Sequence, residues 1–317
     1  MSSALLADIG GSKSRFALAD SAGRPERILI IDNGTVPSLE EAVSQYLQTT
    51  SARPRAATLA IAGPIDDGEE IALTNRTWRF RRSEFARRFG FAPLHVVNDF
   101  EAIAWALLRL TAADIRPLGA PVPPRDGVKL VLGPGTGLGV AALVPTHGRW
   151  QVVASEGGHA SFGPQAPDEI EVFGRIMRDC GSVSAETILS GPGIVRLARA
   201  LDPQRAWPTS EAILKGALAR DPSAQAVVRR FVRLLGRFAG GLALTFKALG
   251  GVYVTGGLGT GLGPLFDEAE FRAAFEAHPP YQKLLAGIPT FLMTCAEPGL
   301  IGCAAVADGF VPVAPVT

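Results

Sequence analysis

Residues 130–143 have the sequence LVLGPGTGLGVAAL, in which two apolar runs flank four glycines at alternate positions. Glycine tolerates positive φ and lets backbone N–H groups approach a ligand closely, so the pattern predicts a strand, a phosphate-binding turn and a second strand. Residues 5–18, LLADIGGSKSRFAL, align with this stretch at an offset of 125 residues. The repeat predicts two related domains, each containing a glycine hairpin; a chance similarity between β-hairpins is the alternative.

The composition of the 317-residue chain is that of a folded globular protein. Apolar residues make up 47% and charged residues 19%, and 31 Lys and Arg against 30 Asp and Glu give a net charge of +1. This balance excludes a mainly disordered chain and provides no bulk field that favours nucleic acid or anionic lipid. Two uncharged stretches, 130–148 and 248–266, are too rich in glycine and proline for membrane helices, and they indicate buried strands that run into glycine loops.

The N-terminus and the cysteines both indicate a cytoplasmic protein. The first residues, MSSALLADIGG, lack a basic region, and Asp8 interrupts the apolar run early, so no signal peptide is expected. Cys180, Cys295 and Cys303 show no spacing typical of zinc ligands, and they indicate buried, reduced thiols.

Short apolar runs alternate with helical patterns, which predicts parallel sheets covered by helices. A capping box of Ser38 and Glu41 begins one helix, a second follows Asn98 to about Arg109, and a third spans 221–249 with one broad apolar face. The expected strands are 4–8, 15–19, 28–32, 57–61, 94–97, 129–132, 140–144, 150–154, 252–255 and 290–293.

Three glycine clusters are candidates for binding a nucleotide. DIGGS at 8–12 offers a turn with the Asp8 carboxylate at a strand end, where it would hold Mg²⁺ near phosphates; a tight hairpin with a capping Asp is the alternative. GPGTGLG at 133–139 exceeds what a hairpin needs, and Thr136 adds a hydroxyl for a terminal phosphate. TGGLGTGLG at 255–263 would let a base or ribose lie against the backbone. The chain contains neither GxxxxGK[ST] nor GxGxxG, so we expect a nucleotide held between two hairpin loops.

Asn98 and Asp99 come where the predicted strand 94–97 meets a helix. Ligands gather at the carboxyl ends of parallel strands, so Asp99 is a candidate general base. The alternative is a structural aspartate that caps the helix.

Three more polar residues lie in the second half of the chain. Glu156 and His159 follow another predicted strand, and the two glycines between them leave room for a ligand beside both side chains. A structural histidine is the alternative for His159. Glu186, within SAETILSGPG, by itself indicates only a carboxylate at a helix start.

Taken together, the motifs resemble those of bacterial ATP-dependent glucokinases, the hexokinase-type branch of the sugar-kinase and actin-like ATPase superfamily. The matching motifs are collinear and cover essentially the whole chain. They are DIGGS (8–12), AGPI (62–65), TNRTW (74–78), VVNDFEAIA (96–104), GPGTGLGVA (133–141), EGGHASFGP (156–164), SAETILSGPGIVRL (184–197), GGVYVTGG (250–257) and EPGLIGCAA (297–305). The resemblance implies an α/β, two-domain actin-like ATPase/hexokinase (ribonuclease H-like) fold with a central cleft.

The resemblance also implies a role for each candidate residue. The position that matches Asp99 accepts the proton of the glucose 6-hydroxyl, and Asp8 would hold Mg²⁺ through water. The positions that match residues binding the other glucose hydroxyls are Asn98, Glu156, His159 and Glu186. The positions implied for ATP are Asp8, Gly10, Gly11, Ser12, Gly133, Gly135, Thr136, Gly137, Gly256 and Gly257.

The family organisation implies a small α/β domain at 1–110, completed by a C-terminal helix at 299–317, and a large domain at 111–298. Residues 111–126, which hold four prolines, indicate the connection between the halves. The implied enzyme is an ATP:D-glucose 6-phosphotransferase that uses MgATP to make glucose 6-phosphate, the first step of glucose catabolism. A cytoplasmic homodimer is expected, with no nucleic-acid or membrane partner.

Three departures from the family pattern stand out. Lys13 puts a positive charge beside the first glycine loop, and Arg76 stands where relatives often have His. The cysteine-rich zinc motif of the ROK sugar kinases is absent, which argues against that branch.

Several other functions remain open at this point. A kinase for another hexose, such as mannose or an amino sugar, would need similar hydroxyl contacts. A non-catalytic, sugar-sensing transcription regulator would need a DNA-binding module, for which a first strand at Ala4 leaves no room. An actin-like or chaperone-type ATPase would lack the Asn98–Asp99 and Glu156–His159 pairs.

Overall fold

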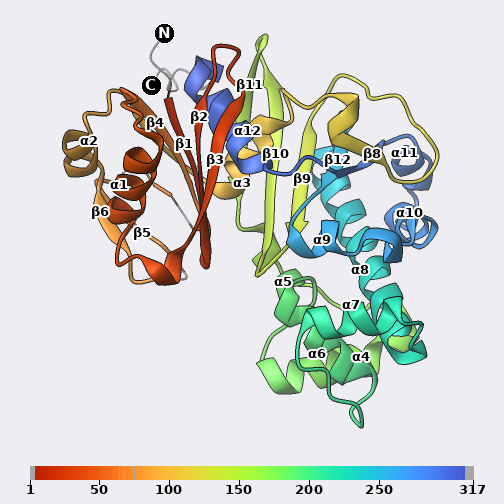
Figure 1. Ribbon diagram of the computed structural model, residues 1–317. Coiled ribbons are helices and arrows are strands. Elements are labelled where there is room, and N and C mark those ends of the chain that lie inside the picture. The colour runs from red at the N-terminus through yellow and green to blue at the C-terminus, as the bar shows by residue number, and fades with distance from the viewer. Residues whose placement is uncertain (1–3, 64, 67, 75, 311–317) are drawn as a thin grey trace. The chain divides into compact units, whose positions relative to one another are not determined.

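The computed structural model describes residues 4–63, 65–66, 68–74 and 76–310, and its contacts divide the chain into two compact units (Figure 1). Unit 1 comprises Met1–Thr111, Leu143–Ala154 and Cys295–Thr317, and unit 2 comprises Ala112–Ala142 and Ser155–Thr294. The stretch Leu143–Ala154 falls in the predicted large domain but groups with unit 1.

Unit 1 contains a five-stranded sheet in the order β3-β2-β1-β4-β7. The first three strands form antiparallel pairs, whereas β4 pairs in parallel with β1 and with β7. The sheet is therefore mixed, and the prediction of parallel sheets was wrong for the hairpin strands. The strands are β1 (Ala4–Ile9), β2 (Lys13–Ala19), β3 (Pro25–Asp32), β4 (Ala56–Ile61) and β7 (Leu94–Asn98).

Alternate side chains of β1 pack on opposite faces of this sheet, because successive residues of a strand point to opposite sides. Leu5, Ala7 and Ile9 join a buried cluster with residues of α1 (Leu39–Thr50) and α2 (Arg82–Phe89). Leu6 joins a second cluster on the other face. α1 and α2 therefore cover one face of the sheet, as Figure 1 shows.

The second face is covered by α3 (Asp99–Ala106) and α12 (Pro298–Ala305). These two helices pack closely at Gly302, where a Cβ would lie only 1.7 Å from the carbonyl oxygen of Ala102. The predicted C-terminal helix is shorter than expected: α12 ends at Ala305 and a π-helical turn, Val306–Phe310, follows. Residues 311–317 of that prediction lie outside the described residues.

Unit 2 is built on a sheet in the order β11-β10-β9-β12-β13-β8. β12 pairs in parallel with β9 and β13, and β8 is antiparallel to β13. The last residues of β10, from Leu143, and all of β11 except Ser155 belong to the segment that groups with unit 1. The strands are β8 (Ile115–Pro117), β9 (Lys129–Pro134), β10 (Leu138–Thr146), β11 (Arg149–Ser155), β12 (Gly251–Val254) and β13 (Thr290–Met293).

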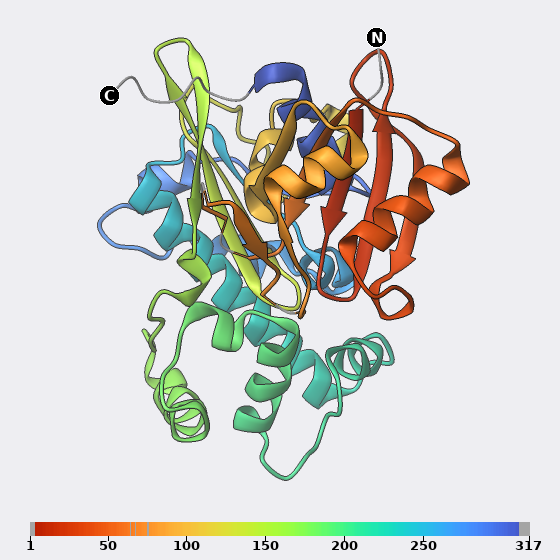
Figure 2. The ribbon, with the colours of Figure 1, turned by 90° about the vertical axis from the view of Figure 1, so that its left-hand side faces the viewer.

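The helices of unit 2 gather around α8 (Pro222–Phe246), which begins at the N-cap Asp221 as expected. Figures 1 and 2 show α4 to α7 below the end of the sheet where β9 turns into β10. The other helices are α4 (Pro167–Cys180), α5 (Ala185–Ile188), α6 (Gly191–Leu201), α7 (Ser210–Leu218), α9 (Gly257–Gly261), α10 (Glu268–Glu276) and α11 (Gln282–Ala286). Short 3-10 turns are Asn33–Thr35, Ala112–Asp114, Gly157–His159 and Gly263–Leu265.

Three arginines at three- and four-residue steps along α8 pair with carboxylates of neighbouring helices. Arg230 pairs with Asp168 of α4, and Arg233 pairs with Glu270 of α10. The third pair, between Arg237 and Glu169 of α4, is buried, and the Arg237 guanidinium lies 4.4 Å from the centre of the Phe162 ring. These three pairs, the arginine row, tie α4 and α10 to α8.

All ten predicted strands are present, with bounds that differ by at most three residues. Two short strands, β5 (Glu70–Ala72) and β6 (Arg79–Arg81), were not predicted. β8 was also missed, because residues 111–126 were assigned to the connection; instead they place a strand on the edge of the unit 2 sheet.

The cysteine prediction was partly wrong. Cys303 is buried, Cys295 is half-buried, and Cys180, at the end of α4, is exposed. In the part of the chain that the structure describes, no helix is both long enough and apolar enough to cross a membrane.

The buried pair of Glu169 and Arg237 should be essential for the stability of unit 2. Glu169→Ala leaves the Arg237 charge buried without its partner, and we expect the free energy of unfolding to fall by about 3–5 kcal/mol in urea titration. Glu171→Ala, which removes an exposed pair with Arg175 on the same helix, should cost less than about 1 kcal/mol. Equal losses in the two variants would contradict this assignment.

Candidate functional site

The loop between β9 and β10 is held by backbone hydrogen bonds at two points. Within the loop, the Gly135 N–H donates to the Gly137 carbonyl at 2.8 Å. From outside, the N–H of Gly191, at the start of α6, donates to the Gly135 carbonyl at 2.7 Å. The glycine loop and α6 therefore form one local structure.

Glu186 also binds this loop. Ser184 and Thr187 form a capping box at the start of α5, so capping does not occupy the Glu186 side chain. Its Oε2 accepts the N–H of Leu138 at 2.8 Å. A Cβ at Gly137 would lie 2.6 Å from the same oxygen, so a side chain there would displace the Glu186 carboxylate. Glu186 is thus more than the helix-start carboxylate that its motif alone indicates.

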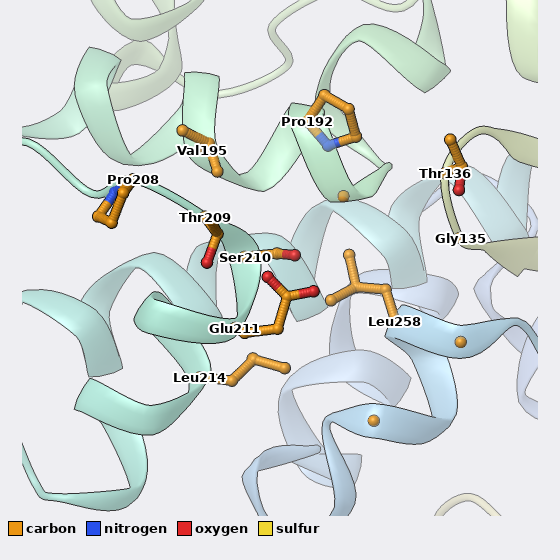
Figure 3. A pocket seen from close by; sticks show the side chains of 13 residues that line it. Gly135, Thr136, Pro192, Val195, Pro208, Thr209, Ser210, Glu211, Leu214 and Leu258 are labelled. Carbon is orange, nitrogen blue, oxygen red and sulfur yellow. The ribbon is translucent and has the colours of Figure 1, made fainter. Parts of the chain in front are cut away.

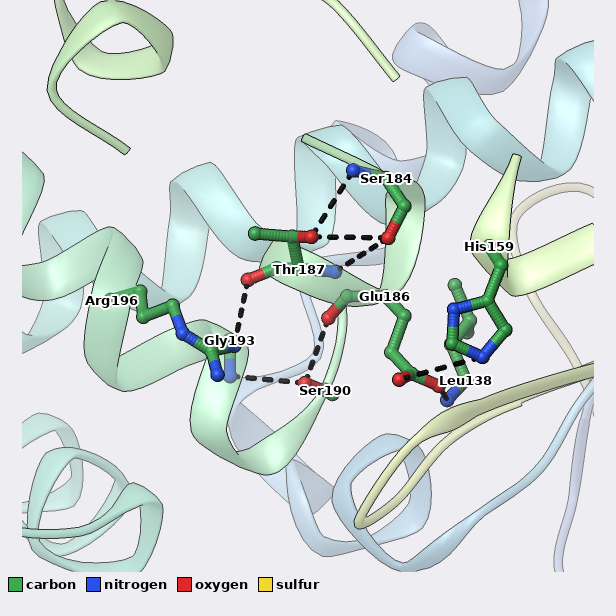
Figure 4. Close-up of polar contacts among 8 residues, drawn as sticks. All are labelled: Leu138, His159, Ser184, Glu186, Thr187, Ser190, Gly193 and Arg196. Atoms are coloured by element: carbon green, nitrogen blue, oxygen red, sulfur yellow. Dashed lines mark hydrogen bonds and ion pairs between the residues drawn. The ribbon is translucent and has the colours of Figure 1, made fainter. Parts of the chain in front are cut away.

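His159 lies opposite Glu186 (Figure 4). Its Nε2 is 3.8 Å from Glu186 Oε1, and 61% of the His159 side chain is exposed. The backbone that carries it is fixed by Gly158, where a Cβ would lie 2.0 Å from the Leu138 carbonyl oxygen. The pair presents one carboxylate and one imidazole to solvent, which suits a ligand with several hydroxyl groups.

These two side chains line a polar cavity of about 390 Å³. Glu156 is not among its lining residues; it is exposed and precedes the turn that carries His159. The cavity is lined by Thr136, His159, Cys180, Ser182, Ser184, Glu186, Thr187, Ser190, Pro192 and Arg196. Four serine and threonine side chains beyond Thr136 make this wall rich in hydrogen-bonding groups.

A second, larger cavity of about 810 Å³ shares Thr136 and Pro192 with the first (Figure 3). Its volume suits a nucleotide or another small ligand. It is lined by Gly135, Thr136, Gly191, Pro192, Val195, Pro208, Thr209, Ser210, Glu211, Leu214, Gly257, Leu258 and Gly261. The predicted residues Gly135, Thr136 and Gly257 thus lie at one cavity, although they come from two separate glycine clusters.

Gly133 and Gly256 shape the backbone beside this cavity. Gly256 has φ +86°, and a Cβ there would lie 2.6 Å from the Pro134 carbonyl oxygen and 2.9 Å from the carbonyl carbon of Gly133. The third glycine cluster begins a short helix, α9, instead of the open loop expected from its sequence.

In unit 1 the glycine loop between β1 and β2 is braced by Asn33, which the sequence patterns did not single out. The buried Asn33 amide donates to the carbonyls of Gly10 at 2.8 Å and Gly11 at 3.4 Å, and its Oδ1 accepts the Ser14 hydroxyl at 2.6 Å. Gly10 N–H donates to the Lys13 carbonyl at 3.1 Å. These bonds fix the shape of the loop that contains Ser12.

Asp8 lies near the end of β1, where the charges of Arg15 and Glu297 affect its carboxyl. Burial raises the pKa of its carboxyl to about 6, Arg15 opposes that shift, and Glu297 adds to it. Arg15 Nε lies 2.7 Å from Glu297 Oε2. A Cβ at Gly299 would lie 2.7 Å from Asp8 Oδ2, so α12 approaches this carboxylate closely.

Asn98 and Asp99 lie at the end of β7, as predicted. Asn98 is the N-cap of α3: its Oδ1 accepts the N–H groups of Phe100 and Glu101, and its Nδ2 donates to the Gly63 carbonyl at 2.9 Å. Asn98 thus fills the N-cap position, and Asp99 is the first residue of the helix. Asp99 Oδ1 accepts the Phe100 N–H at 2.9 Å.

A sequence profile described as Glucokinase matches residues 5–309. The chain belongs to the glucokinase family. Its resemblance to that family, inferred from the collinear motifs, is thereby confirmed, as is the α/β fold of sugar kinases and actin-like ATPases.

Individual glucokinase-family relatives match nearly the whole chain. "Glucokinase" of Mesorhizobium japonicum is 40% identical over 96% of this chain and 91% of its own length. "Bifunctional protein glk" of Burkholderia orbicola is 41% identical over 95% of this chain, which spans only 48% of that relative. A crystal structure of glucokinase from an Antarctic psychrotroph has a TM-score of 0.87 and 32% identity, covering 97% of this chain and 99% of that one.

The family implies the use of ATP. Among the described residues, no group of three or more His, Cys, Asp or Glu could hold a metal ion. A single carboxylate such as Asp8 fits Mg²⁺, which is commonly held by one or two carboxylates together with substrate phosphates and water.

The buried negative charge of Asp8 should lower the free energy of unfolding of the protein. Its pKa is 3.8 when exposed and about 6 in the fold, so the ionised form destabilises the fold increasingly as the pH rises from about 4 to 6. We expect Asp8→Asn to raise the free energy of unfolding by up to about 3 kcal/mol at pH 8 without Mg²⁺, and by less at pH 5.

Asp20→Asn is the control for that measurement, because backbone hydrogen bonds from Arg24 and Ala22 lower the Asp20 pKa. This variant should not be stabilised at either pH. An Asp8→Asn protein less stable than the parent at pH 8 would contradict the pKa assignment.

Proposed function

We propose that this protein phosphorylates glucose to glucose 6-phosphate with MgATP, as an ATP:D-glucose 6-phosphotransferase. The observation that carries the proposal is the pair of cavities that share Thr136: a polar one with Glu186 and His159, and a larger, mainly apolar one. A sugar suits the polar cavity, and adenosine suits the other. The glycine loop between them would then receive the phosphates.

The sugar-binding role falls to side chains that remain available for hydrogen bonding. Glu186 Oε1 and His159 Nε2 face each other at 3.8 Å, too far for a direct hydrogen bond, so hydroxyl groups of a sugar would satisfy both. Glu156 and Asn98 complete the proposed set. Asn98 has one amide hydrogen on Gly63, and its second is available as a donor.

The phosphate-binding role falls to two glycine loops. Gly10, Gly11 and Ser12 are held in place by Asn33, and Gly135, Thr136 and Gly137 are held by Gly191 and Glu186. Backbone N–H groups in such loops neutralise phosphate charge at short range. Gly133, Gly256 and Gly257 shape the adenosine side.

Asp8 is the proposed Mg²⁺ residue, through water. The ion would supply positive charge that offsets the phosphates during transfer. The same charge would lower the Asp8 pKa, so the carboxylate would be ionised when the nucleotide is bound.

Asp99 is the proposed general base. The glucose 6-oxygen forms a bond to the γ-phosphorus, the bond from that phosphorus to the β,γ-bridging oxygen breaks, and the hydroxyl proton moves to Asp99. ADP is the leaving group. Phosphoryl transfer depends mainly on positioning and electrostatics, so the base has to orient the hydroxyl as well as accept its proton.

The finer organisation remains part of the proposal. We propose a small domain at 1–110, completed by the C-terminal residues, and a large domain at 111–298. The protein would act in the cytoplasm, where ATP and Mg²⁺ are abundant. The family resemblance further supports a homodimer, which light scattering would test.

The proposed activity is tested with a panel of sugars and MgATP. A sugar that lacks a matched hydroxyl leaves polar groups unpaired once it covers them, so kcat/KM for glucose should exceed that for galactose and N-acetylglucosamine by about tenfold or more. Mannose tests the alternative of a kinase for another hexose. Equal kcat/KM for glucose and N-acetylglucosamine would overturn the glucokinase proposal.

Asp99→Asn tests the general base. The variant keeps the Oδ1 contact with the Phe100 N–H but cannot accept the proton, so kcat should fall by about 10²–10⁴-fold while the Kd for glucose changes less than about tenfold. Asp267→Asn, which alters the N-cap of α10, is the control and should keep kcat. A kcat of Asp99→Asn within fivefold of the parent would remove Asp99 from this role.

A further inference from the structure

Glu211 is the one charged side chain among the residues that line the larger cavity. It lies in the first turn of α7, whose N-cap is Thr209. Figure 3 shows its carboxylate beside Ser210 and pointing toward the middle of the cavity, with Gly135 and Thr136 at another side. A charged group in this position must face whatever molecule fills the space.

The carboxylate is held in its ionised form. Hydrogen bonds from its own backbone N–H and from the hydroxyls of Thr209 and Ser210 lower the Glu211 pKa. Among the described residues, none of the ion pairs includes Glu211. It is therefore an exposed anion that only accepts hydrogen bonds.

A carboxylate repels phosphate and stabilises a neutral donor, which limits the part of a nucleotide that can lie beside it. The phosphates belong at the glycine loop with Thr136, and the apolar side chains of Val195, Leu214 and Leu258 suit the flat base. The ribose lies between base and phosphates in every nucleotide. Its 2′- and 3′-hydroxyls are adjacent donors, and the two oxygens of one carboxylate can accept both.

We propose that Glu211 determines sugar specificity at the nucleotide site by accepting hydrogen bonds from both ribose hydroxyls. The site would thereby select ribonucleoside triphosphates over deoxyribonucleoside triphosphates. This inference rests on the proposed function, because it places the nucleotide in the larger cavity. It assigns to this chain a residue outside the glycine loops and outside the motifs implied for ATP.

The test is equilibrium binding of ADP, 2′-deoxyADP and 3′-deoxyADP by titration calorimetry without glucose. A hydrogen bond to a charged acceptor is worth roughly a 10- to 100-fold difference in affinity, so the parent protein should bind ADP that much more tightly than either deoxynucleotide. In Glu211→Ala the ADP preference should fall to within threefold. The affinity for 2′-deoxyADP should also fall, because its 3′-hydroxyl loses the same acceptor, but by less than the affinity for ADP.

Two further variants make the result specific. Glu211→Gln keeps the shape but has one acceptor oxygen, so its ADP preference should lie between those of the parent and Glu211→Ala. Glu40→Ala removes an acidic residue from the first turn of α1, which is not among the residues that line this cavity, and should keep the parental preference. Circular dichroism establishes that each variant is folded.

The contrary outcomes are distinct. An unchanged preference for ADP in folded Glu211→Ala and Glu211→Gln would overturn the proposal. A loss of discrimination against inosine diphosphate, with the deoxynucleotide ratio unchanged, would place Glu211 on the adenine amino group instead. Failure of the parent to bind ADP or to phosphorylate glucose would defeat the proposed function itself, whereas ADP binding without any ribose preference would defeat only this inference.

Discussion

The contact between the Glu186 carboxylate and the backbone N–H of Leu138 is the constraint on which the candidate site in unit 2 depends. It fixes one oxygen on the glycine loop at 2.8 Å and leaves the other facing His159. A side chain at residue 137 would displace this carboxylate from its position, because a Cβ there would lie 2.6 Å from Glu186 Oε2. The glycine loop and the Glu186 carboxylate are therefore parts of one local structure, linked by this hydrogen bond.

At the β1–β2 loop of unit 1, one residue stabilises the fold and another destabilises it. There the buried Asn33 satisfies two loop carbonyls, which stabilises the fold, whereas Asp8 is held where its charge is costly. Both features serve one loop, but only Asp8 opposes folding. Such local conflict between stability and charge is typical of functional sites.

The sequence predicted the main strands well because their signals are strong. The strands at 4–9, 56–61 and 129–134 are buried apolar runs bounded by glycine or polar residues, and that pattern does not depend on distant partners. The short strands β5, β6 and β8 have three residues each, too few for an alternation of apolar and polar residues to be recognised in the sequence. Their pairing depends on neighbours that the local sequence does not reveal.

Only some residues of the candidate site could be recognised from the sequence. Glycine clusters mark close backbone approach, so Gly135 and Gly137 were recognisable from sequence. The role of Asn33 was not, since an asparagine after a strand looks like any turn residue until its buried contacts are known. Glu211 was missed for the same reason: its helix is remote in sequence from the glycine loops, and only the fold brings it to the cavity.

The arginine row on α8 has a consequence for how unit 2 moves. The row links α4 and α10, which are about 100 residues apart in the chain, through a single helix. That helix also contacts α6 and α7, which carry walls of the larger cavity. Segments joined in this way tend to open together as one cooperative unit. The walls of the larger cavity would then share a common opening free energy, so that access to it is governed by the whole helical layer.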